Sequence, residues 1–160
     1  MKVFWNACKQ SVKLPQKKAT FALNRIGMDV TVIYLFILLA IASIPSLIGE
    51  LSANNHSVHI HPFFLLIYFF IFYYLVLVLI VFSALSVFAY IATILAKGLG
   101  RKLQFSIMWK MAAFAMTIPL LLFTVLSFIY PLSFIFVTLS IIYMLIVTLK
   151  IILIYPKMKK

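Results

Sequence analysis

Long apolar runs separated by short basic or polar segments dominate the chain. The longest run, Phe63 to Ala96, contains no Lys, Arg, Asp, Glu, Asn, Gln, Gly or Pro. As a helix it would reach roughly 50 Å, which exceeds the bilayer hydrocarbon core of about 30 Å. The runs do not alternate apolar and polar residues, as the strands of a membrane barrel do. The pattern therefore predicts an all-α fold, a polytopic membrane helical bundle.

Four transmembrane helices are predicted within a single integral membrane domain, residues 1–160. We expect the spans at about 28–48, 63–96, 111–129 and 132–155, because each of these segments is long and apolar enough to cross a bilayer. Backbone polar groups have no water to bond in lipid, so helices are the expected form of each span.

An N-terminal amphipathic helix is predicted over residues 1–14. Phe4, Cys8 and Val12 fall on one side of a helical wheel with Trp5 beside them, and the opposite side is rich in Lys. Such a helix either lies in the lipid headgroup region or packs on the protein's own helices, and the sequence leaves both placements open. Pro15 is expected to end the helix.

The outer part of the second span, 63–74, is crowded with aromatic residues. Because aromatic side chains gather at membrane interfaces, these turns are expected in or above the interface, with the span proper nearer 75–96. A strongly tilted single helix is the alternative. Two spans joined by a tight turn are disfavoured, because the segment has no turn residue.

Small and proline residues mark helix contacts and bends. Pro119 lies inside the third span, where it must kink the helix, and Thr117 is expected to satisfy part of the freed backbone. Small residues at helical spacing let helices approach closely, so they indicate either packing within the bundle or a docking face for a partner. These residues are Ser86, Ala89, Thr93 and Ala96 on span two, and Ala113 and Thr117 on span three.

The net charge of +12 is interpreted as a topology signal and not as a nucleic-acid signal. All 14 Lys and Arg residues precede span one, separate spans two and three, or lie at the end of span four. By the positive-inside rule this places both termini in the cytoplasm of a cell membrane. Anionic lipid headgroups are the expected partners of the exposed cations. The residues expected to contact them are Lys9, Lys13, Lys17, Lys18, Arg25, Arg101 and Lys102.

Three histidines in the polar connection 49–62 are the candidate metal site. His56, His59 and His61 could hold zinc or copper, with Glu50 adding an oxygen ligand. Their spacing matches no strong metal signature, so two other interpretations stay open. The histidines either face water and headgroups in a polar loop, or they sense pH.

Enzymatic function is not expected, and no cofactor is predicted. The sequence has no nucleotide-binding loop and no plausible nucleophile with a base and an orienting group. No carboxylate lies deep in a span, whereas proton-coupled carriers usually need one. Lys150, near the inner end of span four, is expected to extend its amine to the membrane surface.

Two stretches resemble a known family. The first is Phe4, Ser11 and Pro15, followed by basic residues and a span ending in Ile44-Pro45. The second stretch is Arg101-Lys102-Leu103, Trp109-Lys110, Ala115, Thr117 and Pro119. Together they resemble the bacterial DUF1189 membrane proteins, which are distantly similar to the Yip1 family, with a shorter extracytoplasmic loop here. The resemblance implies a Gram-positive cell membrane and an accessory role, and it supplies no catalytic residues.

Two functions from different classes follow. The first is a non-enzymatic accessory or scaffold subunit that docks on a membrane complex such as a transporter. The alternative is a self-contained channel or small-solute carrier, acting as a homo-oligomer. The two differ in whether Ser83, Ser86, Thr93 and Thr117 face a common water-filled lumen or dry packing.

Overall fold

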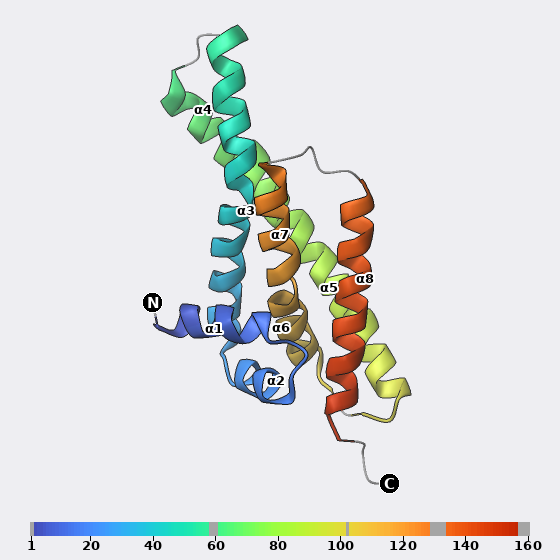
Figure 1. Ribbon diagram of the computed structural model, residues 1–160. Coiled ribbons are helices and arrows are strands. Elements are labelled where there is room, and N and C mark those ends of the chain that lie inside the picture. Colours follow the sequence, from blue (N-terminus) through green and yellow to red (C-terminus); the bar gives the residue numbers. More distant parts are fainter. Residues whose placement is uncertain (1, 58–60, 102, 129–133, 157–160) are drawn as a thin grey trace.

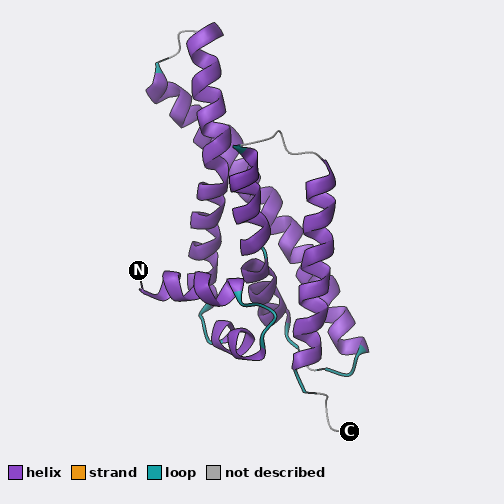
Figure 2. Cartoon of the chain, viewed as in Figure 1, coloured by secondary structure: helices purple, strands orange, loops and turns teal. Residues whose placement is uncertain are grey.

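The computed structural model describes residues 2–57, 61–101, 103–128 and 134–156, and this part of the chain forms helices and no strand (Figure 2). In chain order the elements are α1 (Lys2–Val12), α2 (Lys17–Asn24), α3 (Met28–Ser57), α4 (Pro62–Tyr68), the π-helical turn η1 (Phe69–Tyr74), α5 (Leu75–Gly98), α6 (Phe105–Ala115), α7 (Thr117–Ser127) and α8 (Phe134–Ile154).

Four helical stretches are long and apolar enough to cross a membrane. They are Met28–Ser52, Phe63–Gly98, Phe105–Ser127 and Ile135–Ile154. The predicted all-α bundle with four spans and an N-terminal helix is confirmed. The protein has the fold of a multi-pass membrane protein.

Two helices extend beyond the spans expected from the sequence. The first span was expected to end at about residue 48, and α3 continues to Ser57, with the Ser52 hydroxyl donating to the Ile48 carbonyl within it. The third span was expected to begin at about residue 111, and α6 begins at Phe105. Polar side chains lie in both extensions, since they are compatible with a helix, and the limits of the spans in the membrane stay predictions. The boundaries expected at 129 and 132 lie outside the described residues.

The second span is one unbroken helical run from α4 through η1 to α5. It runs obliquely to α3 and α8 in the bundle (Figure 1). An unbroken helix fits both predictions, that of a tilted span and that of outer turns in the interface, and argues against two spans joined by a tight turn. In η1 the backbone hydrogen bonds span five residues instead of the four of an α-helix. The Leu75 N–H, for example, donates to the Phe70 carbonyl.

Helix α1 lies across the bundle on the side where α2 is found, toward the end at which α8 finishes (Figure 1). It packs on α2, α6 and α7, with Ala7 and Ser11 fully buried. Trp5 is 61% exposed on the other side, and the Lys9 amine lies 5.5 Å from its ring centroid. The predicted apolar side was partly wrong, because Val12 is exposed. The helix therefore packs on the bundle and still presents an aromatic and basic side.

Helix α2 was not predicted. Ala19, Thr20 and Leu23 form its buried side, and it packs against α1, α6 and α8. Its remaining positions are mostly exposed, including Lys17 and Lys18. Eight residues with two lysines at the start gave no apolar run, so the segment was interpreted as a basic connection.

Tyr34 of α3 is the centre of the packing. Its hydroxyl lies 2.8 Å from the Thr117 hydroxyl, and its ring lies 5.0 Å from the Phe4 ring and 5.3 Å from the Phe114 ring. Thr117 uses its only hydroxyl hydrogen on the Phe114 carbonyl, at 2.7 Å, so Tyr34 is the donor of the pair. One side chain therefore connects α1, α3, α6 and α7.

The third span bends where α6 ends at Ala115 and α7 begins at Thr117. Pro119 lies just after this break, and its ring would collide with the Ala115 carbonyl in a regular helix. The bend is therefore located one turn before the proline. It places the Thr117 hydroxyl between two helices, where it meets Tyr34.

Replacing Tyr34 by Phe should lower the free energy of unfolding by about 1 kcal/mol, because the hydrogen bond is lost while the ring contacts remain. The matched control is Tyr90→Phe, since Tyr90 lies exposed on α5. Unfolding by denaturing detergent in mixed micelles measures both variants. An equal effect of the two substitutions would contradict the central role of Tyr34.

Candidate functional site

The outer hairpin, residues 44–57 of α3 together with α4 and η1, extends beyond the ends of α7 and α8 (Figure 1). Helix α3 has 30 residues, or about 45 Å, whereas α8 has 21 residues, or about 32 Å. The shorter helix already matches the hydrocarbon core of about 30 Å. The outer hairpin is therefore longer than a bilayer crossing requires.

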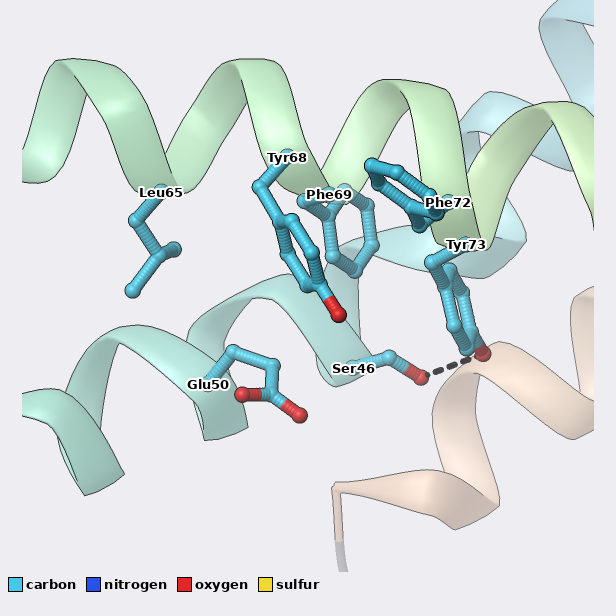
Figure 3. A pocket seen from close by; sticks show the side chains of 7 residues that line it. All are labelled: Ser46, Glu50, Leu65, Tyr68, Phe69, Phe72 and Tyr73. Carbon is cyan, nitrogen blue, oxygen red and sulfur yellow. Dashed lines mark hydrogen bonds between the residues drawn. The ribbon is translucent and has the colours of Figure 1, made fainter.

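A cavity of about 250 Å³ lies between the two arms of the outer hairpin (Figure 3). Ser46 and Glu50 line it from α3, where a spacing of four residues places them on one face. The other arm contributes Leu65, Tyr68, Phe69, Phe72 and Tyr73. We call this cavity the hairpin pocket.

Ring stacking and one hydrogen bond shape the hairpin pocket. The centroids of Tyr68 and Phe72 lie 4.8 Å apart, and those of Phe69 and Tyr73 lie 4.7 Å apart, both as stacked pairs. The hydroxyls of Tyr73 and Ser46 lie 2.8 Å apart and join the two arms. Three of these rings belong to η1, so the π-helical turn builds the aromatic wall.

The hairpin pocket is aromatic and anionic. The carboxylate of Glu50 and the hydroxyl of Tyr68 point toward the same space (Figure 3). Glu50 is one of only two acidic residues in the sequence, and the described residues that line the pocket include no Lys or Arg. Sequence reasoning offered Glu50 only as an added metal ligand. The i, i+4 pair Ser46 and Glu50 was visible in the sequence, but its aromatic partners required the pairing of the two arms.

The predicted histidine site is only partly covered by the described residues. The side chain of His56 and all of His59 lie outside them. His61 caps the start of α4, where its Nδ1 accepts a hydrogen bond of 3.3 Å from the Phe63 N–H, and its ring is edge-on to Phe64. One nitrogen of His61 therefore serves the helix end, and metal binding by the three histidines stays a prediction.

The small-residue set lies inside the bundle, where α5 packs on α6. Ala89 and Ala96 of α5 are fully buried, as are Ala113 and Thr117 of the third span. The Ser86 hydroxyl accepts a hydrogen bond of 3.2 Å from the Trp109 indole nitrogen. These side chains pack the chain's own helices, so a partner would have to dock elsewhere.

Three of the four hydroxyls proposed to distinguish a lumen from dry packing, those of Ser86, Thr93 and Thr117, bond to carbonyls three or four residues earlier. Ser86 and Thr93 donate to the carbonyls of Phe82 and Ala89, four residues earlier. Ser83 is exposed, whereas Thr93 and Thr117 are buried. Near Pro119, an apolar cavity of about 200 Å³ lies between α5, α7 and α8, and none of these four hydroxyls lines it. Their arrangement is that of dry packing.

Most of the basic residues predicted to contact lipid are exposed on α1, α2 and the turns that follow them. They are Lys9, Lys13, Lys17, Lys18 and Arg25. Lys102 lies outside the described residues.

Arg101 is partly buried and has a structural contact, since its guanidinium donates a hydrogen bond of 2.6 Å to the Leu153 carbonyl near the end of α8. Lys110 behaves similarly and was wrongly assigned to a loop. From α6 its amine donates to the carbonyls of Asn24 and Ile26, at 2.8 and 3.0 Å. Both cations therefore satisfy carbonyls at helix ends, where positive charge is favourable.

These features define a multi-pass helical membrane protein with an aromatic and anionic pocket in its outer hairpin. Residues 51–152, from the outer part of α3 into the last turn of α8, match the family model described as Protein of unknown function (DUF1189). The chain belongs to this family, as the resemblance indicated. No curated protein and no solved structure matches the chain.

Replacing Lys110 by Met should lower the free energy of unfolding by about 1–3 kcal/mol, because two carbonyls between α2 and α3 lose their donor. Lys97→Met is the matched control, since Lys97 is exposed at the end of α5. Thermal unfolding in uncharged micelles measures both. If Lys110→Met were as stable as the control, the bonded role of this amine would be refuted.

Proposed function

We propose that this protein is a non-catalytic accessory subunit that docks on a membrane protein complex through its outer hairpin. The observation that carries the proposal is a set of exposed aromatic rings on an element longer than a bilayer crossing. The large side chains exposed on α4 and η1 include Phe63, Phe64, Tyr68, Phe70 and Phe72. The rings of η1 lie at the level of Ser46, within the hydrocarbon core, whereas Phe63 and Phe64 precede this level on the outer side and would face headgroups or water unless another surface covers them.

Aromatic side chains favour this assignment over simple lipid contact. Each ring can bury on the order of 150–250 Å², and aromatic residues are enriched at the centre of protein interfaces. A contiguous apolar patch outside the membrane indicates an interaction site. The other candidate docking face, made of small residues on α5 and α6, is already occupied within the bundle.

The dry interior argues against the alternative of a self-contained channel or carrier. The hydroxyls that could line a path bond to their own helices, and the cavity beside Pro119 is apolar. A path formed between several copies would need polar side chains on an outer face. The exposed side of α8 instead carries large apolar residues, among them Leu139 and Leu153.

We further propose that the protein lies in the cell membrane with both termini in the cytoplasm and the outer hairpin outside. The distribution of the 14 basic residues supports this orientation, since neither 49–62 nor 129–133 contains one. A docking partner would then be met at the extracytoplasmic surface.

A photoreactive phenylalanine analogue at position 64 should crosslink to a protein of different sequence in native membranes. Phe64 is 65% exposed on the outer hairpin, and the matched control is Leu139, which is 59% exposed on α8 and should crosslink mainly to lipid. Mass spectrometry identifies the adducts. Lipid adducts alone at both positions would refute docking, and an adduct with a second copy would favour a homo-oligomer.

Labelling with a membrane-impermeant thiol reagent should reach a cysteine at position 55 and miss cysteines at positions 13 and 99. The variants are Asn55→Cys, Lys13→Cys and Leu99→Cys in a Cys8→Ala background. Position 99 is preferred to Gly100, whose φ of +68° would be strained in any other residue. Labelling of position 99 from outside intact cells would overturn the orientation.

A further inference from the structure

The hairpin pocket has the composition of a cation site. Aromatic rings carry negative charge on their faces, so several rings around one space attract a positive group, and a carboxylate adds a full negative charge. Tyr68, Phe69, Phe72 and Tyr73 supply the rings, and Glu50 supplies the carboxylate. The described rings and the carboxylate belong to opposite arms of the outer hairpin, so a ligand between them would touch both.

Among the described residues that line the hairpin pocket, Glu50 has no Lys or Arg beside it. The sequence has no Lys or Arg between Arg25 and Lys97, and of the three histidines in this stretch His61 caps α4 while the side chains of His56 and His59 lie outside the described residues. Glu50 is exposed, so its carboxylate is open to a positive group from solution or from the headgroup layer.

The depth of Glu50 decides which cations can reach it. It lies 22 residues after Met28 on α3, or about 33 Å along the helix axis, so it falls near the outer limit of the hydrocarbon core. Ammonium groups of lipids and dissolved organic cations are both present at that level.

The lining favours an organic cation over a metal ion. Metal ions such as Ca²⁺ and Mg²⁺ need about six oxygen ligands, whereas the described residues that line this cavity offer one carboxylate and three hydroxyls, two of which already bond to each other. At about 250 Å³ the cavity is smaller than typical drug-sized sites and suits a group the size of a trimethylammonium head.

We infer that the hairpin pocket binds a small organic ammonium group, held between the Glu50 carboxylate and the faces of the surrounding aromatic rings. The group belongs either to a dissolved cation or to a lipid headgroup. This binding goes beyond the accessory role proposed above. Binding of the ammonium group needs no partner protein, whereas the accessory role does, so either proposal can fail while the other stands.

Calorimetric titration with choline tests the inference on the whole purified protein in uncharged maltoside micelles, which contain no ammonium group. Choline should bind saturably, whereas its neutral carbon analogue 3,3-dimethylbutan-1-ol should not, because only choline carries the charge. Glu50→Gln should weaken choline binding at least about tenfold. Absence of saturable choline binding, or equal binding of the neutral analogue, would overturn the proposal.

Asp29→Asn is the matched control, since it removes the only other acidic charge, on the first turn of α3, and should leave choline affinity unchanged. Tyr68→Leu removes one ring face and should also weaken binding, whereas a misfolded variant would be recognised by a lower unfolding temperature. Equal choline affinities of the Glu50→Gln and Asp29→Asn proteins would show that the pocket is not the site.

Phosphatidylcholine distinguishes the two sources of the ammonium group. If a few molecules of this lipid per micelle abolish choline binding, and native mass spectrometry finds the lipid retained by wild-type protein but not by Glu50→Gln, the occupant is a headgroup. If choline binds equally well with the lipid present, the occupant is a dissolved cation. Retention of equal lipid by both proteins, with no choline binding, would refute the site.

Discussion

The hydrogen bond between Tyr34 and Thr117 is the contact on which the arrangement of the bundle depends. Pro119 interrupts the regular helix of the third span at Met116, and the Thr117 hydroxyl beside this interruption bonds to Tyr34 of α3. Tyr34 is itself enclosed by rings from α1 and α6. Pro119, Thr117 and Tyr34 therefore act together. The proline interrupts the helix, the Thr117 hydroxyl bonds to the Phe114 carbonyl at the interruption, and Tyr34 holds this part of the third span against α1 and α3. In lipid, where helices gain little from hydrophobic association, such contacts determine which packing is adopted.

Basic residues have two roles that charge counting does not separate. On α1 and α2 they are exposed and remain available to anionic headgroups. Arg101 and Lys110 instead satisfy carbonyls at helix ends and connect elements far apart in the chain. A topology argument treats all these cations alike, because it asks only on which side they lie. The structure shows that part of the positive charge at this end of the bundle holds the bundle together.

The number and type of spans could be predicted from the sequence because length and apolar content are sufficient for that purpose. The ends of the helices could not be predicted, because they involve polar side chains whose contacts form only in the fold. Ser52 bonds within α3, past the end expected for the span. Lys110 lies in α6, where its amine bonds to a carbonyl of another segment. Helix α2 is short and weakly apolar, so it left no periodic signal. The hairpin pocket was missed because Glu50 acquires its aromatic surroundings only when two helices pair. Of the three histidines predicted to bind metal, His61 alone has a described side chain, and it caps a helix.

The π-helical turn η1 marks a place where the second span can change length. Its backbone hydrogen bonds reach back five residues instead of four, so the turn takes up one residue more than an α-helix would, and the helices on either side keep nearly the same orientation. Deleting one residue from η1 would therefore restore an α-helix and leave α4 facing much as before, while α5 stays packed on α6. The side chains of the turn itself would be rearranged, and Phe69, Phe72 and Tyr73 are among them. A change of one residue in this turn would thus alter the aromatic wall of the hairpin pocket and keep the packing of the bundle.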